Sequence, residues 1–241
     1  FKESITMNIC VIPARGGSKR IKKKNIKFFL GKPVIAYSIL AALKSNCFDQ
    51  VIVSTDDEEI KNISEKWGAK VPFIRPKDLS DDYTPINDVV IHSLESMINL
   101  GYDVKNVCCV YATAPFIQPK YIHLSYKELL KRDKFFCLSV CQFTYPVQRA
   151  LKLMAGNTIE PIWDKYIPMR SQDLVHAYHD SGQFYWGTAK AFIKNKEVLS
   201  SNSTYIVLPS YLVQDIDTLD DWKRAELMFE VLQKYSKIRK I

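Results

Sequence analysis

The chain has 241 residues and a formal net charge of +8. Its length suits one substantial domain, and 47% hydrophobic with 25% charged residues is typical of a folded globular protein. No run approaches the roughly 18 consecutive apolar residues of a membrane span, so we expect no membrane association. Six cysteines without a C-x-x-C pair argue against a zinc ribbon, and indicate buried free thiols in a reducing cytoplasm.

Strands and helices are predicted to alternate along most of the chain. Residues 1–6 lack the apolar core of a signal peptide, and we interpret them as leader or appended sequence. Short apolar runs predict strands at 7–14, 50–55, 70–76, the start of 104–116, 135–143 and 205–209. Apolar residues at helical spacing predict helices at 33–46, 56–68, 85–101, 119–133 and 218–237.

This alternation predicts an α/β fold with a mostly parallel sheet between helices. Ligands of such sheets bind beyond the carboxyl ends of the strands. The stretches PARGGSK, STDD and YATAPF each follow a predicted strand, so we expect them on one rim. For Asp56 and Asp57, in STDD, we favour a cap of the following helix, and Gly68 suits the end of that helix.

Residues 144–183 interrupt the alternation. They carry a hairpin-like turn at Gly156-Asn157 and large apolar side chains such as Trp163. We interpret them as an arm inserted into a single domain of residues 7–241. Because such an arm would expose apolar surface, we expect it to pack on a second copy in a homodimer.

The first strand runs into a glycine turn and a basic segment. From Arg15 to Lys32 there are eight Lys or Arg and no Asp or Glu, which equals the whole net charge. Two glycines let backbone N–H groups approach a ligand, and Arg15, Lys19 and Lys24 suit phosphate oxygens. The alternative is a solvated basic loop. Neither the P-loop nor the dinucleotide fingerprint matches here.

The segment IPARGGSKRIKKKN resembles the opening of the CMP-sugar synthetases. These cytidylyltransferases activate sialic acid and related nonulosonic acids. The likeness continues through LGKPVIAYSI, FDQVIVSTDDEEI, LSDDYTP and DIDTLDDWKRAE, in that order along nearly the whole chain. It implies a Rossmann-like nucleotidyltransferase fold and CTP as the donor nucleotide.

The resemblance also implies where the nucleotide binds. Arg15, Lys24 and Asn25 match the residues that hold the triphosphate, and the loop 80–84 matches the one that frames the cytosine. Local chemistry does not separate cytosine from other bases, so another nucleotide stays open. The predicted nucleotide-binding residues are Ala14, Arg15, Gly16, Gly17, Ser18, Lys19, Lys24, Asn25, Ser80, Asp81 and Thr84.

Asp215 and Asp217 precede the final helix two residues apart. In an extended segment both carboxylates point to one side and can share Mg²⁺, which prefers few carboxylates plus phosphate oxygens. The alternative is a helix cap, a role that Thr218 or Asp220 could fill instead. The D-x-D of the resembled family matches here, and we expect a metal site.

The segment 169–187 mixes Arg, Gln, Tyr and His, which suits a sugar acid with acylamino groups. Arg170 could meet the carboxylate. A zinc pair of His176 and His179 lacks a third ligand. This segment and residues 109–116 resemble the pseudaminic acid branch more than the sialic acid branch. The predicted sugar-binding residues are Tyr111, Arg170, Gln172, Tyr178, His179, Gln183 and Tyr185.

We therefore expect a cytidylyltransferase that joins CTP to pseudaminic acid, with Arg15, Lys24 and Asp217 as catalytic residues and Mg²⁺ on Asp215 and Asp217. Legionaminic or sialic acid is the nearest alternative substrate. A basic nucleic-acid-binding protein is the alternative from another class. That class predicts aromatic residues between the basic ones, where only Phe28 and Phe29 occur, so we expect no nucleic-acid partner.

Overall fold

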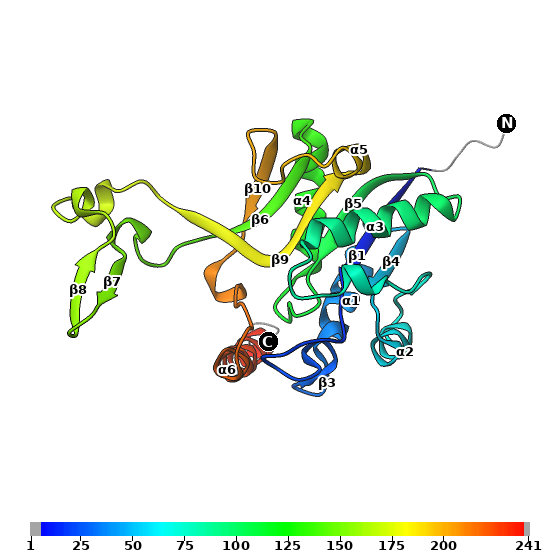
Figure 1. Ribbon diagram of the computed structural model, residues 1–241, viewed down its shortest axis with the longest axis horizontal. Helices are drawn as coiled ribbons and strands as arrows, with labels where there is room; N and C mark the ends of the chain where they lie inside the picture. Colours follow the sequence, from blue (N-terminus) through cyan, green and yellow to red (C-terminus); the bar gives the residue numbers. More distant parts are fainter. Residues whose placement is uncertain (1–5, 239–241) are drawn as a thin grey trace.

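The computed structural model describes residues 6–238, so the predicted leader lies outside the described residues except for Thr6. Within this range, a central sheet has the strand order β10-β6-β9-β5-β1-β4 (Figure 1). Its strands are β1 (Met7–Pro13), β4 (Gln50–Ser54), β5 (Val104–Val110), β6 (Phe136–Gln142), β9 (Tyr178–Thr188) and β10 (Ser203–Val207).

The sheet is mostly parallel, as predicted. Strand β1 pairs in parallel with β4 and β5, and β10 pairs in parallel with β6. Strand β9 is antiparallel to both of its neighbours, β5 and β6. The parallel pairing brings the carboxyl ends of β1, β4 and β5 to one edge.

Helices cover both faces of the sheet (Figure 1). On one face, Ile39 of α1 and Ile122 of α4 belong to one buried apolar cluster. On the other face, Leu94 of α3 and Phe192 of α5 belong to a second. The helices are α1 (Val34–Lys44), α2 (Glu58–Lys66), α3 (Ile86–Asn99), α4 (Pro119–Arg132), α5 (Ala189–Ile193) and α6 (Leu219–Ile238).

Three predicted helix boundaries are confirmed by their hydrogen bonds. Asp57 caps α2, because its carboxylate accepts from the Ile60 N–H at 2.9 Å. Gly68 ends the same helix with a φ of +96°, which suits a residue without a side chain. Thr218 caps α6 by accepting from the Asp221 N–H at 3.2 Å, and the Asp221 carboxylate accepts from the Thr218 N–H at 2.9 Å.

Helix α6 packs through an aromatic cluster on the segment that follows the glycine turn. This segment contains the short strands β2 (Phe28–Phe29) and β3 (Lys32–Pro33). The Phe29 ring meets those of Trp222 and Phe229 edge-on, at centroid separations of 5.6 and 5.5 Å. The helix predicted at 218–237 is confirmed, and its packing fixes residues 215–218 beside the basic loop.

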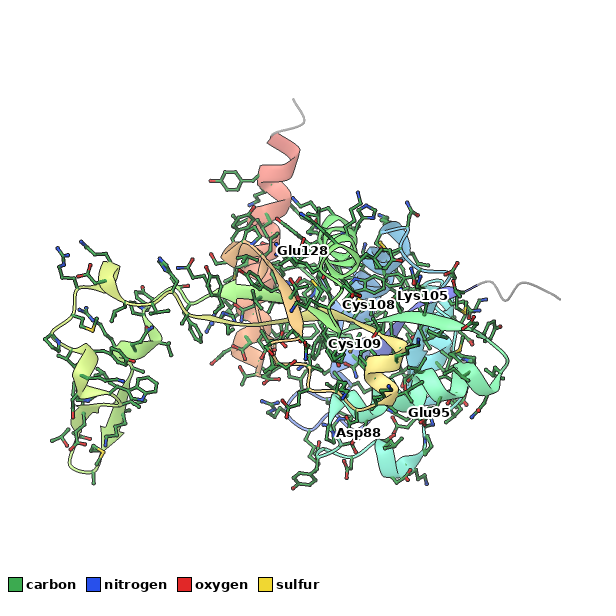
Figure 2. All side chains as sticks on the ribbon, turned by 90° about the horizontal axis from the view of Figure 1, so that it is seen from above. Asp88, Glu95, Lys105, Cys108, Cys109 and Glu128 are labelled. Carbon is green, nitrogen blue, oxygen red and sulfur yellow. The ribbon has the colours of Figure 1, made fainter. Side chains whose placement is uncertain are left out.

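The predicted arm contains a hairpin of β7 (Leu151–Met154) and β8 (Thr158–Pro161), with Gly156-Asn157 at its turn. The hairpin projects from the body in both views (Figures 1 and 2). The arm is shorter than the predicted 144–183, since β9 enters the sheet at Tyr178.

Two sequence predictions are wrong. The expected strand at 70–76 is reduced to an isolated bridge between Ile52 and Lys70. Pro72 and Pro76 lack the N–H groups that a longer ladder would need. Strand β9 was missed, because its polar first half reads as a ligand-contacting loop.

All six cysteines are buried free thiols, as predicted. Figure 2 labels Cys108 and Cys109 inside the body. Burial raises the pKa of the Cys109 thiol to about 12, which keeps it protonated and unreactive at neutral pH. In the described part of the chain, every helix is too short or too polar to cross a membrane.

Candidate functional site

A cleft of about 280 Å³ lies beyond the carboxyl ends of β1 and β5. One wall is formed by the turn at Gly16 and Gly17, hereafter the glycine loop, and by the basic segment after it. The other wall is formed by residues 75–89. Its lining residues are Pro13, Arg15, Ser18, Lys19, Arg20, Ile21, Lys24, Asn25, Arg75, Leu79, Asp81, Asp82, Thr84, Ile86, Val89, Tyr111, Ala112, Thr113 and Asp217.

Seven of the predicted nucleotide-binding residues line this cleft: Arg15, Ser18, Lys19, Lys24, Asn25, Asp81 and Thr84. Asn25 shapes the loop, because its side-chain amide donates to the Arg15 carbonyl at 2.9 Å. Ala14 is buried beneath the loop, and the Ser80 hydroxyl donates to the Pro76 carbonyl. Those two positions support the walls and do not line the cleft.

Asp82 pairs with two cations of the loop. Its carboxylate lies 2.5 Å from Arg15 Nη2 and also contacts Lys19. Hydrogen bonds from Lys19 and Arg15 hold the pKa of Asp82 below its usual range. The two walls are therefore joined by ion pairs across the cleft.

Asp217 reaches the cleft from the residues before α6. Its carboxylate lies 3.1 Å from Lys24 Nζ and 2.9 Å from Arg20 Nη1. Partial burial alone would raise the pKa of Asp217, but Lys24 and Arg20 outweigh it and lower that pKa. The basic segment after the glycine turn therefore faces the second aspartate of the D-x-D pair.

Asp215 is outside the cleft lining, near Tyr111 and Asp180. One of its carboxylate oxygens accepts from the Ile216 N–H at 2.9 Å. Burial, and to a smaller extent Cys109, Asp180 and Asp215, raises the pKa of Tyr111. No group of three metal-ligating side chains is found among residues 6–235. The two aspartates fit a Mg²⁺ ion only if phosphate oxygens complete its coordination.

The predicted sugar-binding residues do not form one cluster in the single chain. Tyr111 lines the cleft. Arg170 is on the arm, paired with Asp173 at 2.7 Å, and Gln172 is its neighbour there. Tyr178 and His179 lie where β9 enters the sheet, opposite Gln142 and Cys141.

Gln183 and Tyr185 were predicted to contact sugar, but both lie in the interior. Gln183 is 4% exposed, and its side-chain amide donates to the Leu212 carbonyl. Tyr185 is also 4% exposed and belongs to the apolar cluster under α3. Because β9 is a sheet strand, these side chains are directed into the core rather than into the cleft.

Arg75 is a cleft residue that the sequence analysis missed. Its side chain is 3% exposed, yet Nε and Nη2 have no hydrogen-bond partner among the described residues. Burial lowers the pKa of Arg75, and nearby Asp56 opposes this effect. A buried guanidinium with free donors at a cleft is suited to a polar ligand. The clue in the sequence was a lone Arg in the apolar run VPFIRP.

Residues 9–216 match the family model described as cytidylyltransferase. This chain belongs to the cytidylyltransferase family. A pseudaminic acid cytidylyltransferase of Campylobacter jejuni subsp. jejuni serotype O:2 is 45% identical over 93% of this chain and 97% of its own length. A CMP-N,N'-diacetyllegionaminic acid synthase of Legionella pneumophila is 32% identical over 94% of this chain and 97% of its own.

The fold agrees with solved structures of more distant proteins. A CMP:2-keto-3-deoxy-manno-octonic acid synthetase solved in complex with CTP has a TM-score of 0.69 at 14% identity, over 93% of this chain and 99% of its own. The expected nucleotidyltransferase fold is thereby confirmed, and this cytidylyltransferase is an enzyme, as expected.

Proposed function

We propose that this cytidylyltransferase joins CTP and pseudaminic acid to give CMP-pseudaminic acid and pyrophosphate. The observation that carries the proposal is the cleft that Arg15, Lys19, Arg20 and Lys24 line together with Asp217, which pairs with Arg20 and Lys24. Several cations around one glycine turn suit a triphosphate. The higher identity to a relative named for pseudaminic acid, 45% against 32% for the legionaminic relative, favours that sugar.

In the proposed reaction, the anomeric hydroxyl of the sugar attacks the α-phosphorus of CTP. A new P–O bond forms, the bond between the α-phosphorus and the bridging oxygen breaks, and the hydroxyl proton is released. Arg15 and Lys24 would stabilise the charge that builds on the departing pyrophosphate. Loss of one such donor typically lowers turnover about 10²- to 10³-fold.

Arg75 lies on the cleft wall that also holds Leu79 and Thr84, where the resemblance places the cytosine. Its Nε and Nη2 groups are buried and have no hydrogen-bond partner among the described residues, so by turning toward the cleft they could donate to the oxygen and ring nitrogen of that base. We therefore add Arg75 to the proposed nucleotide-binding residues. Uracil, which carries a donor at its N3, would be matched less well.

Asp215 and Asp217 would hold the Mg²⁺ ion of the reaction, together with phosphate oxygens of CTP. Bound there, Mg²⁺ would lower the pKa of the attacking hydroxyl and screen its charge from the phosphate. Asp217 lines the cleft, and Asp215, two residues earlier in the chain, is outside its lining. Lys24 and Arg20 would orient the Asp217 carboxylate in this role.

We also propose that two copies pair through the arm. Leu153 and Ile159 are 85% and 60% exposed, and Trp163 is 42% exposed. Apolar side chains gathered on a projecting hairpin need a covering surface. In a homodimer, Arg170 and Gln172 could reach the sugar bound to the other copy. With six buried free thiols, the enzyme is suited to the cytoplasm.

Pyrophosphate release tests the proposal. Each of CTP, UTP, ATP and GTP is combined with pseudaminic, legionaminic or sialic acid, with Mg²⁺ or with EDTA. We expect release only from CTP, pseudaminic acid and Mg²⁺ together. Pyrophosphate release with legionaminic or sialic acid, but not with pseudaminic acid, would assign that acid as the substrate instead. Tight, salt-sensitive binding of oligonucleotides without any release would favour a nucleic-acid-binding protein.

The metal proposal has its own variant. Asp217→Asn should lower turnover about 100-fold or more but lower the thermal midpoint only slightly, because ion pairs that solvent still reaches contribute little to stability. Asp220→Asn is the matched control, since Asp220 is an exposed residue of the same segment. Near-normal turnover of the Asp217 variant would refute its catalytic role.

A further inference from the structure

We propose that Asp56 is a positioning residue that holds the glycine loop and Arg75 in the arrangement that binds the nucleotide. This inference rests on the function proposed above. Asp56 and Asp57 follow β4, and Asp57 alone caps α2. The Asp56 side chain is turned instead toward two parts of the cleft.

One oxygen of Asp56 serves both parts. Oδ1 accepts a hydrogen bond from the Gly16 N–H at 3.0 Å. The same oxygen lies 3.8 Å from Arg75 Nη2, which is an ion-pair distance but too long for a hydrogen bond. A single carboxylate therefore connects the backbone of the glycine loop with the buried guanidinium on the opposite wall.

The longer contact has a physical consequence for Arg75. A guanidinium buried without a counter-charge is strongly destabilising. Asp56 supplies that charge from a distance that leaves Nε and Nη2 without hydrogen-bond partners among the described residues. Arg15 is close enough to lower the pKa of Arg75 further, so the negative charge of Asp56 is needed on this side. The result is a buried guanidinium that is fixed at the cleft wall, with Nε and Nη2 left without a hydrogen-bond partner among the described residues.

Backbone contacts keep Asp56 itself in position. The Ala14 N–H donates to the Ser54 carbonyl at 2.9 Å, and the Arg75 N–H donates to the Thr55 carbonyl at 2.8 Å. The two segments that Asp56 joins are thus bonded to the two residues before it. Gly16 fits closely, since a Cβ there would lie 2.7 Å from Asp57 Oδ2.

Two variants separate the two contacts. Asp56→Ala removes the acceptor for Gly16 and the charge beside Arg75. Asp56→Asn keeps a carbonyl oxygen for Gly16 but removes the charge. Pyrophosphate has no base, so its affinity measures the glycine loop. CMP carries the base, so its affinity measures the wall that holds Arg75. Asp57→Asn is the matched control, because asparagine caps helices as well as aspartate.

Calorimetric titration of CTP, CMP and pyrophosphate into the full chain gives the test. We expect Asp56→Ala to weaken CTP at least tenfold and to weaken both CMP and pyrophosphate. Asp56→Asn should weaken CMP and CTP but bind pyrophosphate within twofold of the wild type. In turnover assays, the KM for CTP should rise in both variants, with the KM for the sugar acid unchanged. Asp57→Asn should match the wild type throughout.

The proposal is overturned if Asp56→Asn binds CMP as the wild type does, or if it weakens pyrophosphate as much as CMP. It is also overturned if the only change is a lower thermal midpoint, since a purely structural role would give that result. The isosteric Asn variant keeps the test valid if the Ala variant does not fold. Wild-type protein that binds CTP but releases no pyrophosphate with any sugar acid would instead refute the proposed function.

Discussion

Arg15 and Asp82 form an ion pair across the cleft, with 2.5 Å between Nη2 and Oδ1. Lys19 contacts the other oxygen of the same carboxylate. Two cations of the glycine loop are thus held by a carboxylate of the opposite wall. A phosphate chain that binds the loop must replace Asp82, and so binding and the spacing of the two walls are linked.

Asp82→Asn should therefore tighten the binding of pyrophosphate. Exposed ion pairs are weak, so removing the competing carboxylate should lower the dissociation constant only about two- to tenfold. Calorimetric titration at low and moderate salt measures the effect, which should shrink as salt rises. Asp88→Asn, in the first turn of α3, is the control. Weaker binding by the Asp82 variant would show that Asp82 supports the anion site instead.

Gly16→Ala should impair CTP binding much more than Gly17→Ala. A Cβ at Gly16 would overlap the Asp57 side chain at 2.7 Å, whereas nothing lies within 4 Å of one at Gly17. The overlap would push the loop away from Asp56 and the cleft. We expect at least a tenfold larger KM for CTP from the first variant. Equal effects of the two variants would mean that the loop tolerates this shift.

Acid should destabilise the enzyme through carboxylates whose pKa is lowered in the folded state. Asp81 and Asp221 are lowered chiefly by hydrogen bonds from Thr84 and Thr218, while Asp82 is lowered chiefly by those from Lys19. Their contribution is fully present above the unfolded value of about 3.9 and is lost as pH falls through the folded values.

Thermal midpoints measured from pH 7 to 3 should stay level to about pH 5 and then fall. Asp221→Asn should flatten part of that fall, because it removes one of the titrating groups. The pKa of Asp221 is lowered first by hydrogen bonds within the helix cap. Added salt should therefore change the contribution of Asp221 to the fall in thermal midpoint only little. A midpoint that rises on acidification would contradict this account.

Leu153→Asp with Ile159→Asp should convert the proposed dimer to a monomer. The two residues face each other across the hairpin, so both lie on one side of it. Charges there would oppose an apolar interface but leave the separate core intact. Sedimentation velocity at micromolar concentration measures the change. The pair Lys152 and Glu160, replaced by Ala, is the control from the same hairpin. A wild-type monomer would refute the dimer proposal.

The sequence predicted the parts of the site that depend on strand ends. Alternating strands and helices place the glycine loop and the residues after β5 on one rim, because a parallel sheet brings these strand ends together independently of the side chains they carry. Lys24 and Asp217 are 193 positions apart, and their meeting could be expected only from the resemblance to a known family. The helix caps at Asp57 and Thr218 followed from local chemistry.

The missed features depend on tertiary context. Arg75 sits in an apolar run between prolines, and nothing local shows that it is buried with free donors. Asp56 and Asp57 are the same residue type in neighbouring positions, but only one of them caps the helix. Gln183 and Tyr185 look like ligand contacts until β9 is known to be a strand, because the direction of each side chain depends on the sheet.

Strand β6 leads into the arm, and β9 brings the chain back directly beside it, from Gln142 opposite Tyr178 to Phe136 opposite Gly187. The chain therefore leaves and re-enters the sheet at one place. Residues between these strands can be lengthened, shortened or exchanged without moving the register of the ladder or the floor of the cleft. The surface that the hairpin contacts can therefore change in evolution while the residues that line the cleft stay the same.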